Sequence, residues 1–117
     1  MSSNPILEKS VKFAERIVKL DKYLKDKNEF VLSNQILKSG TSIGANVTES
    51  TRAQSKADFH TKMTIALKEA DETKYWLGLL KAGEYIDDKA FDSLNDDCEE
   101  IIKLLVAITK SSGNRQL

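Results

Sequence analysis

The spacing of apolar residues near the C-terminus is the feature that most constrains the fold. From residue 88 onward, apolar side chains recur in alternating steps of three and four: Phe91, Leu94, Cys98, Ile101, Leu105 and Ile108. This spacing places all six side chains on one face of an α-helix, and it is typical of a helix that packs in a bundle. One proline and five glycines leave little turn punctuation for a β-protein. The chain is therefore expected to be all-α.

Helix start signals divide the rest of the chain into three further periodic segments. Asn4 followed by Pro5 is an N-cap with a first-turn proline, and Ser55 with Asp58 forms a pair like a capping box. The expected caps of the second and fourth helices are Asp26 or Asn28 and Asp87 or Asp88. The four helices are expected at about residues 5–26, 29–52, 56–82 and 88–110. They form a single domain over residues 1–117, with frayed ends at 1–3 and 111–117.

Composition narrows the class of protein. Lys and Arg together number 18, as do Asp and Glu, so the net charge is zero and no strongly basic nucleic-acid binder is indicated. The single cysteine excludes an internal disulfide and fits a reducing compartment. Neither a secretory signal nor an apolar run long enough to span a bilayer is recognisable. We therefore expect a cytoplasmic protein that does not partner a membrane.

The stretch "SGTSIGANVTES" at residues 39–50 looks like a loop but keeps a helical period. A stripe of small and apolar residues and a separate polar stripe both continue across its two glycines. A phosphate-binding P-loop needs a lysine directly after its second glycine, and Ala45 follows Gly44. Each glycine costs about 0.8–1 kcal/mol against alanine in a helix interior. Gly40 and Gly44 are therefore expected on the face that a neighbouring helix approaches most closely.

Three glutamates of the expected second and third helices could lie close to this stretch in a folded bundle. Helical bundles hold di-iron sites with Glu-x-x-His pairs, but the only histidine, His60, has Ala57 three residues before it. A polar layer is therefore favoured over a metal site, and a site formed by Glu49, Glu69 and Glu72 is kept as an alternative. The residues expected in the polar layer and the associated helix packing are Gly40, Ser42, Gly44, Asn46, Glu49, Glu69 and Glu72. The sequence leaves open whether Asn46 and Glu49 face their own third helix or a neighbouring subunit.

Catalytic groups are not recognisable in the pattern. Cys98 lies on the apolar face, where a small core residue is expected rather than a nucleophile. His60 lies in the first turn of its helix and is expected to be exposed. Because no nucleophile can be paired with a base, the chain is expected not to be an enzyme and to use no cofactor.

Charge is unevenly distributed along the chain: bases outnumber acids in the first helix, and acids dominate the fourth. A stripe of bases on the first helix consists of Lys9, Lys12, Arg16 and Lys19. Such a stripe could contact the phosphates of RNA or another nucleic acid. It could equally be a solvated face, or pair with the acidic helix of a neighbour.

The third helix is apolar on two sides, which indicates more contacts than its own bundle supplies. Trp76 is the candidate subunit contact, because large aromatic residues dominate interfaces. The alternative is that Trp76 completes the core of its own chain.

The segments "SIGANVTES" and "AQSKADFHTKMTIALKEADETKYWL" resemble the family of ribosomal RNA intervening-sequence proteins. The family motif is Ser-Ile-Pro-Ala-Asn, a hydrophobic pair, then Glu-Gly, and it maps onto residues 42–50. This chain departs from the motif at Gly44, where proline is usual, and at Ser50, where glycine is usual. The likeness covers roughly residues 30–86 fully and the outer helices by pattern only.

The resemblance implies an antiparallel up-down four-helix bundle, no catalytic residues and, in related proteins, a homopentamer around a central channel. It also extends to the accessory variability protein of diversity-generating retroelements, a basic protein that binds nucleic acid and partners a reverse transcriptase. The expected function is a non-catalytic, oligomeric scaffold or interaction protein. The alternative is a nucleic-acid-binding accessory protein that uses the basic face of the first helix.

Overall fold

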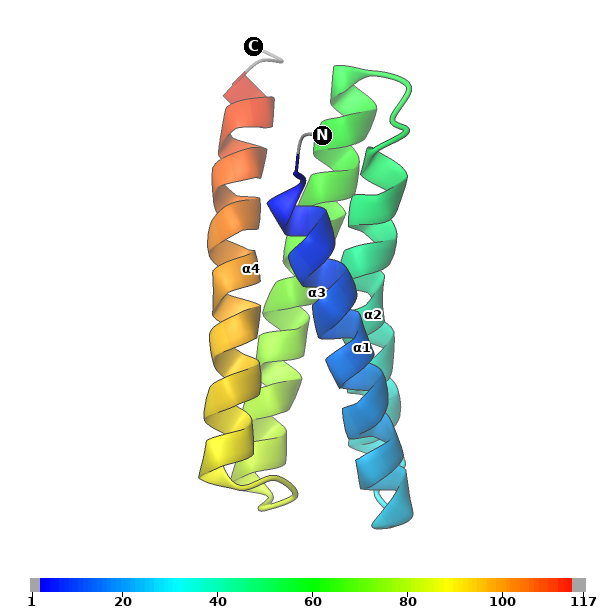
Figure 1. Ribbon diagram of the computed structural model, residues 1–117, viewed down its shortest axis with the longest axis vertical. Helices are drawn as coiled ribbons and strands as arrows, with labels where there is room; N and C mark the ends of the chain where they lie inside the picture. The colour runs from blue at the N-terminus through cyan, green and yellow to red at the C-terminus, as the bar shows by residue number, and fades with distance from the viewer. Residues whose placement is uncertain (1–2, 115–117) are drawn as a thin grey trace.

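The computed structural model describes residues 3–114, which form four helices in a bundle (Figure 1). They are α1 (Pro5–Asp26), α2 (Val31–Ser50), α3 (Lys56–Ala82) and α4 (Asp88–Asn114). Successive helices run in opposite directions, so the topology is up-down (Figure 1). Each helix packs on the next along the chain, whereas α1 and α4 touch more sparsely. The expected all-α class and four-helix bundle are confirmed.

Three helices begin at local caps. The Asn4 side chain accepts a hydrogen bond from the Leu7 N–H at 3.2 Å, with Pro5 in the first turn of α1. Ser55 Oγ accepts from the Asp58 N–H at 3.0 Å at the start of α3. The α4 cap is Asp87, whose Oδ1 accepts from the Ala90 N–H at 2.7 Å. These bonds satisfy N–H groups that have no partner within the helix.

The start of α2 differs from the expectation, because α2 begins at Val31 and its cap is neither Asp26 nor Asn28. Asn28 instead has a φ of 63° and turns the chain out of α1. The buried Glu29 carboxylate accepts hydrogen bonds from the Leu32 N–H at 2.8 Å and the Ser33 N–H at 2.9 Å. An acid just before a helix start also complements the helix dipole.

The end of α4 also differs, since the helix continues to Asn114 and not to about residue 110. Residues 111–114 are therefore helical and not a frayed end. The physical reason is tertiary: the buried Ser112 Oγ lies 2.7 Å from His60 Nδ1 on α3. Residues 1–2 and 115–117, where the remaining frayed ends were expected, lie outside the described residues.

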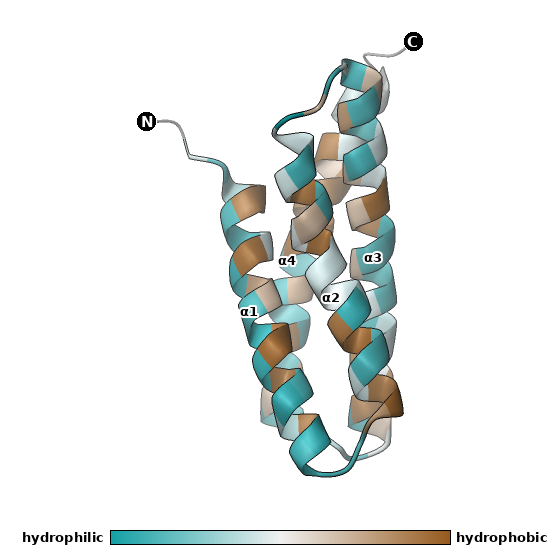
Figure 2. Cartoon of the chain, turned by 90° about the vertical axis from the view of Figure 1, so that its right-hand side faces the viewer, coloured by the Kyte–Doolittle hydropathy of each residue, from teal (hydrophilic) through white to brown (hydrophobic). Residues whose placement is uncertain are grey.

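The core lies along the inner faces of all four helices, and apolar and polar segments alternate along each ribbon in Figure 2. Its largest fully buried apolar side chains are Phe13, Ile17, Leu24, Ile36, Ile43, Leu77, Leu80, Ile101 and Leu105. Cys98 is fully buried among them, as expected. Within residues 3–114, none of the helices combines the length and apolarity that crossing a bilayer requires.

Candidate interaction surfaces

The two glycines of α2 lie where α1 crosses it. A Cβ atom added at Gly40 would be 2.8 Å from Ile17 Cγ1, and one added at Gly44 would be 3.2 Å from the Ser10 carbonyl oxygen. Both glycines are buried. The absence of side chains therefore lets the backbones of α1 and α2 approach closely, as small residues do at helix crossings.

The polar side chains of the family motif bond mostly within α2. Ser42 Oγ donates to the Lys38 carbonyl at 2.6 Å, and Asn46 Nδ2 donates to the Ser42 carbonyl at 2.9 Å. Glu49, by contrast, pairs with Lys62 of α3 at 3.1 Å. The ion pair orients the end of this stripe toward the third helix of the same chain.

Glu69 and Glu72 lie on α3, and each has its own surroundings. Trp76 Nε1 donates to Glu72 Oε1 at 3.3 Å. Partial burial, and secondarily the neighbouring Glu72 charge, raise the pKa of the Glu69 carboxyl above its usual value. Glu49 is held by Lys62 instead, so these residues do not form the single bonded layer that was expected.

The carboxylate metal site, kept as an alternative, is not assembled in the structure. Among residues 3–114, no three side chains of His, Cys, Asp or Glu come close enough to hold a metal ion. The Lys62 ammonium beside Glu49 would also repel a cation.

The structure adds a buried polar contact between α2 and α3 that the expected site did not include. Thr73 Oγ1 lies 2.9 Å from Ser39 Oγ and 2.8 Å from the Glu69 carbonyl oxygen, and both hydroxyl residues are buried. Because a hydroxyl carries one proton, the two acceptors compete for the Thr73 hydrogen. The sequence signal was the placement of Thr73 on the apolar face of its helix.

Two single residues of α3 were assigned surface roles. Trp76 is half-buried, packs against the core and meets the Tyr75 ring edge-on at 5.0 Å between centroids. Its role as a subunit contact stays a prediction. The expected exposure of His60 is wrong, because His60 is half-buried and its Nδ1 contacts Ser112. The extra length of α4 brings Ser112 to it.

Two of the four bases in the stripe on α1 form ion pairs with acids of α4. Lys9 pairs with Glu100, and Arg16 pairs with Asp97 at 2.6 Å. The acidic helix that neutralises these bases is therefore in the same chain. Lys12 and Lys19 are exposed, and no ion pair within residues 3–114 involves either of them.

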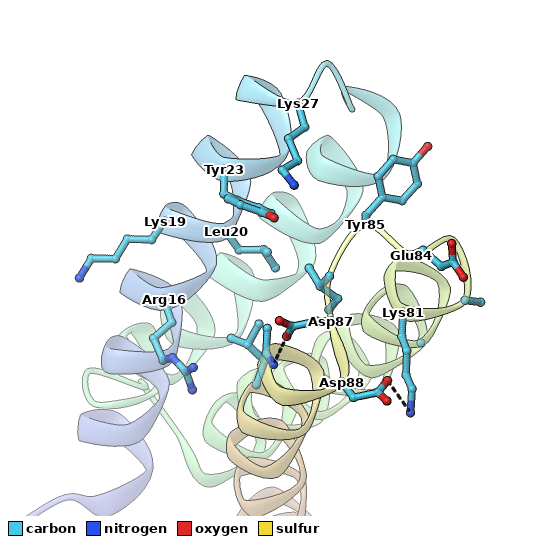
Figure 3. Close-up of a pocket in the computed structure, with 15 residues that line it drawn as sticks. Arg16, Lys19, Leu20, Tyr23, Lys27, Lys81, Glu84, Tyr85, Asp87 and Asp88 are labelled. Carbon is cyan, nitrogen blue, oxygen red and sulfur yellow. Dashed lines mark hydrogen bonds and ion pairs between the residues drawn. The ribbon is translucent and has the colours of Figure 1, made fainter.

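A groove of about 1210 Å³ opens where α1 diverges from the α3–α4 turn (Figure 3). One wall comes from α1 and its C-cap, with Arg16, Lys19, Tyr23 and Lys27. The opposite wall comes from the end of α3, the turn and the start of α4, with Lys81, Glu84, Tyr85, Asp87 and Asp88. The sequence did not predict this groove, because its walls are distant in the chain and meet only in the folded bundle.

The fold and these surfaces define a small antiparallel four-helix bundle with a tight α1–α2 crossing and charged outer faces. The chain belongs to the 23S rRNA-intervening sequence protein family, whose model matches residues 2–107. The resemblance drawn from residues 42–50 is thereby confirmed.

The chain is also similar to a crystal structure of a protein of unknown function from the S23 ribosomal protein family of Bacteroides thetaiotaomicron VPI-5482. The two share 56% sequence identity with a TM-score of 0.88, over 90% of this chain and 98% of that chain. A comparison with curated proteins found no match. Neither the family description nor that of the structure names a reaction.

Proposed function

We propose that the chain is a non-catalytic subunit of a cytoplasmic homo-oligomer that acts as a scaffold or interaction protein. The observation that carries this proposal is an apolar stripe along α1, made of Leu7, Val11, Ala14 and Val18, of which Leu7 packs against the core and the two valines are exposed. Val11 is 44% exposed and Val18 is 51% exposed. The assembly size favoured is the pentamer that the family resemblance implies.

The stripe has the spacing of a helix-packing face, at steps of four, three and four. Val11 and Val18 are each about half exposed, so burying the remainder of one of them against a second copy contributes about half of the roughly 1.5–3 kcal/mol that full burial provides. A partly exposed apolar stripe at helix-packing spacing is therefore the surface expected to associate.

The test is the mass in solution, by size-exclusion chromatography with light scattering. The wild-type chain is expected at a multiple of 13.1 kDa, and the double variant Val11→Glu, Val18→Glu is expected to dissociate. Val106→Glu is the matched control, because Val106 is 47% exposed on α4, outside the stripe. A monomeric wild-type chain at micromolar concentration would refute the proposal. Dissociation by Trp76→Ala, but not by the double variant, would move the interface to α3.

A second candidate function is nucleic-acid binding through the basic face of α1. It is favoured by the exposed ammonium groups of Lys12 and Lys19, which form no ion pair with any residue from 3 to 114, whereas Lys9 and Arg16 are already neutralised by α4. Phosphate contacts release counterions, so affinity should fall steeply with salt. The double variant Lys12→Ala, Lys19→Ala should bind RNA more weakly and with a shallower salt slope. Absence of RNA binding by the wild-type chain at about 50 mM salt would exclude this candidate.

A further inference from the structure

We propose that the groove between α1 and the α3–α4 turn is a binding site for single-stranded nucleic acid, in which Tyr23 and Tyr85 stack bases. This inference rests on the second candidate function and names its site. In this proposal the nucleic acid binds in the groove beside the basic face of α1, and not on that open face itself.

The two tyrosines are the first argument. Tyr23 of α1 is 44% exposed and Tyr85 of the turn is 38% exposed, and both line the groove together with the apolar Leu20 and Ile86. Figure 3 shows the rings on opposite walls. Exposed aromatic rings that line one groove are the platform on which successive bases of a single strand stack. A base pair in a duplex is already stacked and cannot use them.

The charges of the groove are the second argument. Lys27 Nζ lies 4.7 Å from the centroid of the Tyr23 ring, and in the view of Figure 3 its side chain extends between the two tyrosines. Lys19 lies on the same wall of α1. Neither lysine takes part in an ion pair within residues 3–114. Lys19 can therefore meet a phosphate without first breaking an ion pair, whereas Lys27 would exchange its contact with the Tyr23 ring for the phosphate while a base takes its place on the ring.

Two acids of the opposite wall already have partners within the chain. Asp87 accepts the α4 capping bond from the Ala90 N–H, and Asp88 lies 3.9 Å from Lys81 Nζ. Lys81 thus offsets part of the negative charge that Glu84, Asp87 and Asp88 place on that wall, while the α1 wall is basic. A phosphate chain would follow α1, and its bases would point across the groove toward Tyr85.

The shape of the groove is the third argument. Its α1 wall runs from Arg16 to Lys27, which is about 16 Å at the helical rise. The groove is open toward solvent at the end of the bundle (Figure 3). An open, elongated groove suits a chain that enters and leaves better than it suits a small molecule, which proteins usually enclose.

The test is fluorescence anisotropy with a labelled, unstructured single-stranded RNA of about ten nucleotides, within the range that such grooves accommodate. Tyr23→Ala and Tyr85→Ala should each weaken binding roughly tenfold, the effect of losing one stacked base. Tyr23→Phe and Tyr85→Phe keep the ring and should bind like the wild-type chain. Tyr75→Ala is the matched control, because Tyr75 is 59% exposed on α3 and does not line the groove.

A second comparison tests the contribution of charge. It sets Lys27→Ala against Lys22→Ala, because Lys22 is exposed on α1 but lies outside the groove. Only Lys27→Ala should weaken binding and flatten its salt dependence. Inorganic polyphosphate and an RNA duplex of the same sequence should both compete poorly.

The outcomes separate the two proposals. If Tyr23→Ala and Tyr85→Ala bind like the wild-type chain, or if polyphosphate competes as well as RNA, the groove is refuted. The basic-face candidate then stands if Lys12→Ala, Lys19→Ala weakens binding. If the wild-type chain binds no RNA at low salt, the groove and the basic-face candidate fall together.

Discussion

Gly40 of α2 lies so close to Ile17 of α1 that a Cβ atom at Gly40 would be 2.8 Å from Ile17 Cγ1 and 2.9 Å from its Cγ2. Ile17 is fully buried and branched at Cβ, so it has few rotamers to escape into. Gly78, in the last turns of α3, has no atom within 4 Å of the same position apart from its chain neighbours and the backbone of its own helix. The two glycines therefore differ in what an added methyl group would meet.

Gly40→Ala and Gly78→Ala should have opposite effects on stability. Overpacking costs about 1–3 kcal/mol, and the gain in helix propensity returns about 0.8–1 kcal/mol. Gly40→Ala should thus be destabilising by up to about 2 kcal/mol, while Gly78→Ala should be stabilising by about 0.8–1 kcal/mol. Urea denaturation measures both. Equal shifts in the two variants would contradict the close α1–α2 crossing.

Thr73→Val should be destabilising because it leaves the buried Ser39 hydroxyl without its partner on α3. The expected loss is about 1–2 kcal/mol. In the Thr73→Val variant, Ser39→Ala should lower the free energy of unfolding by less than it does in the wild-type chain. The reason is that it removes the hydroxyl that Thr73→Val left unsatisfied. Thr41→Val is the control, since the Thr41 hydroxyl bonds only carbonyls of its own helix. Strictly additive effects at residues 39 and 73 would show that the contact contributes nothing.

Cys98 should be inert toward thiol reagents in the folded chain. Burial raises the pKa of its thiol to about 12, and Sγ lies 3.4 Å from the Ala70 carbonyl oxygen. The thiolate that reacts is therefore scarce and enclosed at neutral pH. An aromatic disulfide reagent should label the chain slowly in buffer and at once in denaturant. Because Cys98 is the only cysteine, rapid labelling of the folded chain would directly contradict its burial.

Glu69→Gln should raise stability near pH 7. Burial and the Glu72 charge raise the pKa of Glu69 in the folded state, so the folded state binds its proton more tightly than the unfolded state does. Ionisation of Glu69 therefore lowers the free energy of unfolding at neutral pH. This loss disappears as the pH falls below the pKa that the carboxyl group has in the unfolded chain. The urea midpoint of Glu69→Gln should exceed that of the wild-type chain at about pH 7 and match it at about pH 3. Glu15→Gln, at an exposed position of α1, serves as the control for loss of a charge.

The boundaries of α3 could be predicted from the sequence at both ends, because its signals are local. Ser55 caps its first turn and Gly83 follows its last residue, so a few neighbouring residues decide where it starts and stops. The start of α2 could not be predicted in the same way. Glu29 caps it from a turn whose geometry depends on Asn28 adopting a left-handed conformation.

The interaction surfaces were less predictable than the helices. The bases on α1 could be located on one stripe, since they share a helical face. Their partners Asp97 and Glu100 lie about 80 residues or more away in the chain, and helical period carries no information about which helix will be the neighbour. The groove was missed for the same reason, since only the packing of the bundle brings Tyr23 and Tyr85 to opposite walls of one groove.

The sequence by itself determined that this chain forms four helices and which faces of the second and fourth are buried, because helical period and caps are properties of residues a few positions apart. It also carried the family motif of α2. Only the tertiary structure decided which bases α4 neutralises, how far α4 extends beside His60, and that Gly40 meets Ile17. These depend on the distance and register between helices, which are determined by side-chain packing across the whole core.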